Sequence, residues 1–250
     1  MRFITEILNC LAYMTILPLS GGRRMSEKDF GRLPAYFPVA GLVLGLILFV
    51  FFKLLEVCGT PPAVSAILLS TVLIIFTRGF HLDGLADTMD ALLSHKSREE
   101  KLAIMKDPHQ GTFGVLSIVL DILLRVTLLT EILKSPDFAA PLILFPVWGR
   151  LTSSTVSAFS RYARPSGGLA QASVERSGFR EFLLAFGLTA AFSLLFGFYP
   201  FLMALITFLL AIVLVWVWDK LMGGITGDLL GASLEITEVT TLFLYVLLFL

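Results

Sequence analysis

Long stretches without a charged residue constrain this chain more than any other feature. Residues 33–52 and 57–77 contain no Asp, Glu, Lys or Arg, and residues 182–218 contain none either. A helix of about 20 residues, rising about 1.5 Å per residue, matches the roughly 30 Å hydrocarbon core of a bilayer. A mean hydropathy of +0.87 points the same way. The sequence therefore predicts an all-α, polytopic membrane bundle that forms a single domain over residues 1–250.

About seven membrane spans are expected, together with interfacial helices. Two further apolar segments lie at about 111–133 and 138–160. Residues 182–218 would be about 56 Å long as one helix, so the break at 197–200 divides them into two spans. The last helix is predicted to begin near Thr226. Residues 1–20 are expected to form an amphipathic interfacial helix, because polar residues interrupt their apolar run and no cleavage site follows.

The basic residues fall unevenly on the two sides of this predicted bundle. Only Lys53 and Lys134 lie on one side. By the positive-inside rule the other side is cytoplasmic, which predicts a multi-pass protein of the plasma membrane, or of the inner membrane where a cell has two. Its basic residues are Arg23, Arg24, Lys28, Arg32, Arg78, Lys96, Arg98, Lys101, Lys106, Arg161, Arg164, Arg176, Arg180 and Lys220. A formal net charge of zero gives no reason to expect nucleic acid as a partner.

Three carboxylates interrupt the apolar pattern in the segment HLDGLADTMDALL, residues 81–93. Asp83, Asp87 and Asp90 are spaced four and three residues apart, so they share one face of a helix. Like charges at this spacing repel by roughly 0.2–0.5 kcal/mol even in water. The alternative, a solvated helix face, is disfavoured by the apolar surroundings. A bound Mg²⁺ or Mn²⁺ is therefore expected, because both ions prefer carboxylate oxygens.

A second acidic set lies in GGITGDLLGASLEITE near the C-terminus. Asp228, Glu235 and Glu238 are seven and three residues apart, again on one helical face. The predicted topology brings both acidic sets to the cytoplasmic edge, where a shared metal would relieve their repulsion. The predicted ligands are Asp83, Asp87, Asp90, Asp228 and Glu235. By contrast, Asp121 and Arg125, four apart inside a span, are predicted to form an ion pair.

Basic residues are expected around these acids, in an arrangement that suits phosphoryl transfer. Arg150 is predicted to act in the site, because it lies inside an apolar span without a local partner. His81 precedes the acids and is read as a general base, a metal ligand or an interfacial residue. The predicted catalytic residues are His81, Asp87, Lys106 and Arg150, and the predicted substrate-binding residues are Arg78, Lys101, Arg161 and Arg164.

Together, these motifs resemble the cobalamin synthase family of adenosylcobinamide-GDP ribazoletransferases. The resemblance rests on HLDGLADTMDALL, REEKLAIMKDPHQGTFGV and GGITGDLLGASLEITE, and extends through YFPVAGLVLGL, VWGR and YARPSGG. It departs from the family pattern at Arg78 and Ala91, where glycine is common, and at His109-Gln110.

The resemblance implies a Mg²⁺-dependent membrane enzyme. A ribose hydroxyl of α-ribazole, or of its 5′-phosphate, would attack the cobinamide-proximal phosphorus of adenosylcobinamide-GDP and release GMP. The product would be adenosylcobalamin or its 5′-phosphate. Lys106, Arg150 and Arg164 would stabilise the developing charge, and the base is either His81 or an acid not engaged with the metal.

Two other functions fit parts of the pattern. A CDP-alcohol phosphatidyltransferase-like enzyme also displaces a nucleoside monophosphate at a carboxylate-rich helix, but Asp83-Gly84 is followed here by LAD, without the expected arginine. A cation-coupled transporter would place its acids near the midplane rather than at the edge. Gly41 and Gly45 form a GxxxG pair that permits close helix contact, and a homo-oligomer is one reading of it.

Overall fold

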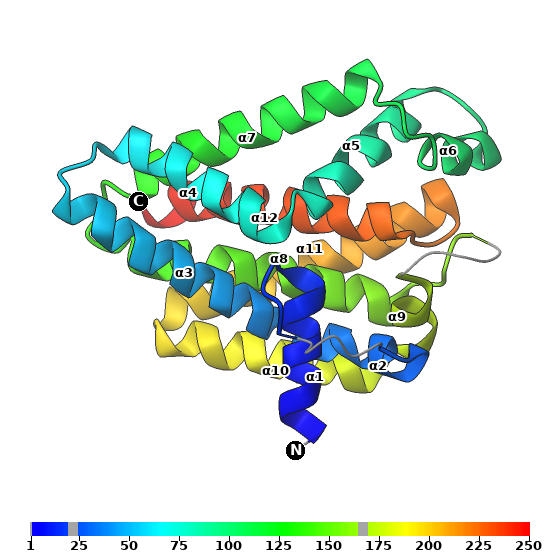
Figure 1. Ribbon diagram of the computed structural model, residues 1–250, viewed down its shortest axis with the longest axis horizontal. Coiled ribbons are helices and arrows are strands. Elements are labelled where there is room, and N and C mark those ends of the chain that lie inside the picture. Colours follow the sequence, from blue (N-terminus) through cyan, green and yellow to red (C-terminus); the bar gives the residue numbers. More distant parts are fainter. Residues whose placement is uncertain (1, 20–24, 165–169) are drawn as a thin grey trace.

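The computed structural model describes residues 2–19, 25–164 and 170–250 (Figure 1). Arg23, Arg24 and part of YARPSGG therefore lie outside the described residues. The predicted all-α bundle is confirmed, and within the described ranges the only β-type pairing is one isolated bridge. The helices are α1 Arg2–Met14, α2 Glu27–Arg32, the 3₁₀ helix η1 Leu33–Tyr36, α3 Phe37–Val57, α4 Pro62–Thr77, α5 Phe80–Leu93, α6 Arg98–Ile104, α7 Thr112–Ile132, α8 Ala139–Phe159, α9 Ala170–Arg176, α10 Phe179–Leu195, α11 Phe198–Met222 and α12 Gly227–Phe249.

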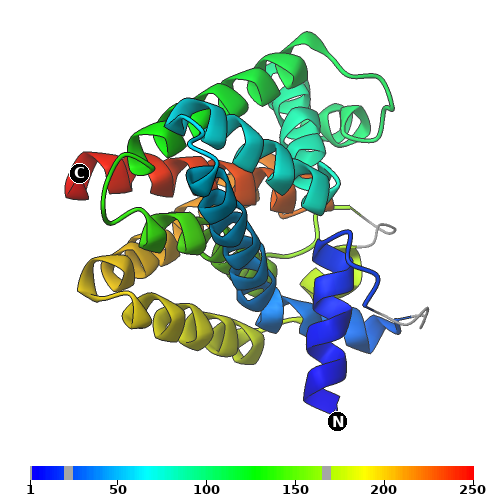
Figure 2. The same cartoon turned by 60° about the vertical axis from the view of Figure 1, so that its left-hand side comes forward.

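Helix α8 is the centre of the bundle. Every residue from 141 to 157 is buried, and α3, α10, α11 and α12 pack around it (Figures 1 and 2). Gly41 and Gly45 make the closest approach, since a Cβ on either would collide with the α8 backbone at Pro146 or Ile143. The GxxxG pair is therefore used for packing inside the chain.

The number of spans differs from the predicted seven. Within the described residues, four helices are long and apolar enough to cross a membrane, or up to six if each of two bent pairs is one span. These four helices include α7, α11 and α12, and α3 is the apolar part of the fourth. Helix α8 does not qualify, because Arg150 and the run of Ser and Thr after it lower its hydropathy.

The acidic segment does not continue the preceding span but turns away from it. Arg78 and Gly79 both have left-handed backbone conformations, with φ of 58° and 64°. The amide of Gly79 closes the end of α4 by donating to the carbonyl of Ile74 over 2.9 Å. Helix α5 consequently leaves α4 at 90°. The sequence predicted both helices but not this turn.

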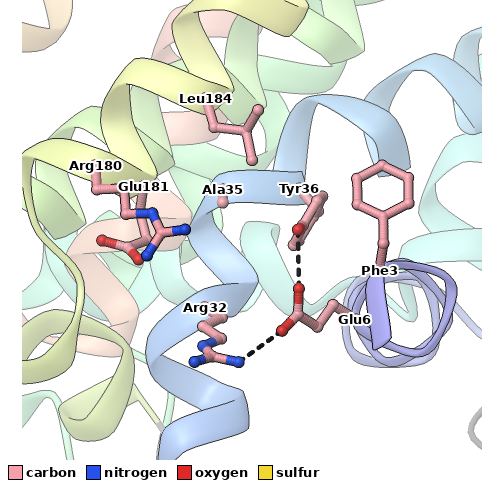
Figure 3. A pocket seen from close by; sticks show the side chains of 8 residues that line it. All are labelled: Phe3, Glu6, Arg32, Ala35, Tyr36, Arg180, Glu181 and Leu184. Carbon is pink, nitrogen blue, oxygen red and sulfur yellow. Dashed lines mark hydrogen bonds and ion pairs between the residues drawn. The ribbon is translucent and has the colours of Figure 1, made fainter. Parts of the chain in front are cut away.

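Helix α1 runs across the direction of the long helices and is fastened to the bundle by polar contacts (Figures 1 and 3). Its Glu6 carboxylate accepts from the guanidinium of Arg32 at 2.8 Å and from the hydroxyl of Tyr36 at 2.9 Å. These residues line one side of a pocket of about 340 Å³ between α1 and α10, and Arg180 and Glu181 of α10 line its opposite side (Figure 3). The predicted amphipathic helix therefore exists, and its place at the membrane interface stays a prediction.

Candidate functional site

The two acidic helices meet through glycines. A Cβ on Gly84 of α5 would lie 2.7 Å from the carbonyl oxygen of Asp228, at the start of α12. One on Gly231 of α12 would lie 3.2 Å from the Cα of His81. Only glycine permits backbones to approach this closely. The predicted meeting of α5 and α12 is therefore present in the fold, and it brings Asp83 and Asp87 beside Asp228.

Asp87 lies at the centre of this acidic group. The charges of Asp83, Asp228 and Asp90 all act on its half-buried carboxylate, while Asp83 is exposed. The side-chain amide of Gln110 donates to Asp87 Oδ1 at 3.0 Å. In the described ranges, no three His, Cys, Asp or Glu side chains already stand close enough to enclose a metal ion. Asp83 and Asp87 of α5 and Asp228 of α12 are the predicted ligands whose charges act on one another.

Asp90 makes two hydrogen bonds that the sequence did not predict. Its two carboxylate oxygens accept from the backbone amides of Gly111 at 2.7 Å and Gly114 at 2.8 Å. Those amides belong to the first turn of α7, where no intrahelical acceptor is available to them. A carboxylate there also interacts favourably with the helix dipole. Asp90 therefore fixes the start of α7 against α5, and each of its oxygens already accepts a backbone hydrogen bond.

Arg164 reaches the acidic group through a short backbone pairing. Residues 161–163 pair with Ile225, because the Ala163 amide donates to the Ile225 carbonyl and the Ile225 amide to the Arg161 carbonyl, both at 2.9 Å. The Arg164 guanidinium then lies 2.8 Å from Asp228 Oδ2. In the same segment, burial raises the pKa of the Tyr162 hydroxyl, and the positive charge of Arg164 acts in the opposite direction on that pKa. The structure thus brings Arg164 to the acids, as the prediction requires.

Glu235 and Glu238 belong to a separate, buried cluster. Arg125 contacts Asp121 at 3.1 Å, Glu238 at 2.6 Å and also Glu235. The predicted ion pair of Asp121 with Arg125 is confirmed. Arg150 pairs with the second oxygen of Glu238. Glu235 was predicted as a metal ligand with Asp83 and Asp87, but on α12 it is turned towards α7, where Arg125 neutralises it.

Arg150 lies in the centre of the bundle, on α8, rather than at its rim. Its side chain is fully buried, and besides Glu238 it donates to the carbonyl of Pro146 at 3.2 Å. In the described part of the chain its Nε and Nη2 atoms have no partner. The predicted direct contact with substrate is inconsistent with this burial. Its hydrogen bond to Pro146 is local in sequence, whereas its carboxylate partner, Glu238, comes from α12.

His81 also lies behind the acidic group rather than in it. Its ring is 4% exposed, and its Nδ1 atom has no hydrogen-bond partner among the described residues. Contact with Gly231 holds it between α5 and α12. This position favours a packing role over the predicted role of general base.

The remaining predicted basic residues line the surface around the site. Lys106 and Arg78 are exposed, and Lys101 is half-buried. Arg161 pairs with Asp219 at 3.1 Å and donates to the carbonyl of Gly223 at 2.9 Å, so it supports the turn before α12. Sequence reasoning missed two residues near the site. Gln110 donates to Asp87, and the guanidinium of Arg98 lies against Gly223. The position of Gln110 just before GTFG was the available signal.

The fold and site together define a class: a polytopic helical membrane protein with an arginine-bordered acidic site between two glycine-packed helices. Within that class, residues 6–246 match the cobalamin-5-phosphate synthase family, and the chain belongs to that family.

Named relatives agree with this assignment. The adenosylcobinamide-GDP ribazoletransferase of Acetivibrio thermocellus is 35% identical over 99% of both chains. That of Caldanaerobacter subterraneus is 35% identical over 98% of both, and that of Pseudomonas aeruginosa is 34% identical over 96% of both. No solved structure matches the chain.

Proposed function

We propose that this chain transfers the cobinamide-phosphate part of adenosylcobinamide-GDP to a ribazole acceptor and releases GMP. The observation that carries the proposal is the meeting of Asp83, Asp87 and Asp228 beside Arg164, in a chain of this family. Carboxylates that repel one another at a membrane protein's rim are stabilised by a cation, and a pyrophosphate donor needs cationic partners.

Mg²⁺ fits the chemistry of this donor set, and Asp83, Asp87 and Asp228 would hold it. When bound, the ion neutralises charge on the pyrophosphate oxygens. Asp90 and Glu235 are left out of the set, because their oxygens are already engaged with Gly111, Gly114 and Arg125. Asp83 is exposed and not paired in the same way.

The transfer itself needs one base and one group that accepts charge. A hydroxyl oxygen of the ribose forms a bond to the cobinamide-proximal phosphorus, and the bond from that phosphorus to the bridging oxygen breaks. The electron pair leaves with GMP. The hydroxyl proton passes to a carboxylate oxygen of this group that the ion does not engage, and the outer oxygen of Asp83, the most exposed of the three, is the one we assign. The Arg164 guanidinium stabilises the charge that develops on the departing phosphate.

The test is GMP release by the purified protein in lipid vesicles, supplied with adenosylcobinamide-GDP, α-ribazole and Mg²⁺. Asp87→Asn should reduce the rate at least 100-fold, because one carboxylate of the set is lost. Asp137→Asn makes the same chemical change at an exposed loop position and should leave the rate unchanged.

Three outcomes would contradict the proposal. Full activity in EDTA would exclude the metal, and a fully active Asp87→Asn variant would exclude the acidic group. Release of CMP from CDP-diacylglycerol and an alcohol, without GMP release from the first substrate pair, would assign the chain to the phosphatidyltransferase reaction instead.

The charge distribution and apolar helices support a plasma-membrane location with the acidic site facing the cytoplasm. A homo-oligomer has no support from Gly41 and Gly45, because both are used against α8.

A further inference from the structure

An open cavity of about 810 Å³ lies beside Asp83. Its walls come from α1, α2, the α4–α5 turn and α7, and most of the lining is apolar. Small-molecule sites of about 300–1,000 Å³ combine such a lining with a few polar groups that fix the ligand's orientation. Here the charged groups are Asp83 and Arg78.

Three aromatic rings form one side of this cavity. The ring of Tyr13 lies edge-on to Phe30 at 5.8 Å and to Phe80 at 6.4 Å between centroids. Phe80 is 46% exposed although it stands next to the buried core of α5. Tyr13 and Phe30 are half-buried, and Phe80 is the exposed ring, so Phe80 offers the surface for stacking with a flat aromatic ring.

Arg78 stands at the rim in a conformation that its side chain does not favour. Its φ of 58° is left-handed, which is rare for residues other than Gly, Asn and Asp. Its guanidinium is exposed, and one nitrogen donates weakly to the carbonyl of Tyr13 at 3.4 Å. The remaining donors can bind an anion, for which the planar guanidinium is well suited. A residue held in such a conformation points to a functional role for its side chain.

We infer that this cavity binds the acceptor nucleotide, with its aromatic base among Tyr13, Phe30 and Phe80 and its 5′-phosphate on Arg78. This places the ribose between them, near the carboxylate of Asp83. The inference rests on the proposed function. Arg78 is then the residue that distinguishes the phosphorylated acceptor from the free nucleoside.

Arg78→Gly is the sharpest test, because glycine adopts φ of 58° without strain and the backbone should be kept. Binding of α-ribazole 5′-phosphate and of α-ribazole is measured by calorimetry on the protein in lipid nanodiscs, without the donor. Arg78→Gly should weaken binding of the phosphorylated acceptor at least tenfold and change binding of the nucleoside less than twofold. Equal weakening of both acceptors, or no change in either, would overturn the inference.

The aromatic wall is tested by Phe80→Leu, with Phe179→Leu as the matched control on α10. Phe179 is 62% exposed and does not line the cavity. Phe80→Leu should weaken binding of both acceptors about fivefold or more, and Phe179→Leu should not. Unchanged binding in Phe80→Leu would overturn the placement of the base.

The binding and turnover measurements separate the two proposals. Binding that responds to Arg78 and Phe80 in a protein that releases no GMP would uphold the site and refute the reaction. Normal GMP release with acceptor KM values that respond to neither residue would refute the site and uphold the reaction.

Discussion

Two neighbouring glutamates on α12 should differ sharply in their contribution to stability. Glu238→Gln and Glu235→Gln make the same chemical change, one helical turn apart. The cluster holds two arginines, Arg125 and Arg150, and three acids, so either change leaves two positive and two negative formal charges. Any difference between the variants therefore comes from geometry rather than from net charge.

The geometry favours a much larger loss for Glu238→Gln. Glu238 is the carboxylate that bridges both arginines, and it is 1% exposed. In Glu238→Gln only one oxygen remains and the amide nitrogen faces the other guanidinium, so Arg125 or Arg150 loses its acceptor; Arg150 would then keep only its hydrogen bond to the carbonyl of Pro146. Removing one partner of a buried pair costs about 3–5 kcal/mol. Without Glu235, Arg125 still has Asp121 and Glu238, so a loss of about 1 kcal/mol is expected.

Thermal unfolding of the purified variants in detergent, followed by circular dichroism, measures the difference. For a chain of this size 1 kcal/mol corresponds to about 2–4 °C in Tm, so Glu238→Gln should lower Tm by roughly 6–12 °C or more. Glu235→Gln should lower it by less than about 4 °C and retain its Mg²⁺ dependence. Equal Tm losses in the two variants would refute the reasoning, and a lost Mg²⁺ response in Glu235→Gln would restore Glu235 as a ligand.

Two further variants test the contacts that shape the acidic site. Gly84→Ala should reduce GMP release at least tenfold, because its Cβ would force α5 away from Asp228, whereas Gly187→Ala, where a Cβ meets open space, should not; equal rates would show that the close approach is dispensable. Asp90→Ala should cost about 0.5–2 kcal/mol through the lost cap and speed amide exchange at Gly111 and Gly114. Unchanged exchange there would contradict the capping role.

The helical bundle was predictable because long uncharged stretches have few ways to fold in a membrane. Asp121 and Arg125 were likewise predictable, since partners four apart on one helix are set by local geometry. The meeting of α5 and α12 followed from the same reasoning, because two acidic edges were expected on one side of the bundle.

The division of the acids into two groups could not be predicted. Spacing along α12 places Asp228, Glu235 and Glu238 on roughly one face, but it does not specify the depth at which each meets a neighbouring helix. Asp228 meets Arg164 from the loop before α9, whereas Glu235 meets Arg125 from the middle of α7. The capping contact of Asp90 was not predicted for a related reason, since a carboxylate that caps a distant helix has no local sequence signature.

The right-angled turn at Arg78 and Gly79 has a consequence for where the acidic residues of α5 stand. In a helix along the membrane normal, residues seven positions apart differ in depth by about 10 Å. When α4 stands along the membrane normal, α5, at 90° to it, lies parallel to the membrane plane. Asp83 and Asp90 then stand at similar depths. In that orientation the carboxylates of Asp83, Asp87 and Asp90 follow one level of the bundle. The turn at Arg78 and Gly79 therefore spreads the acidic residues of α5 sideways, whereas a straight continuation of α4 would spread them along the direction of that helix.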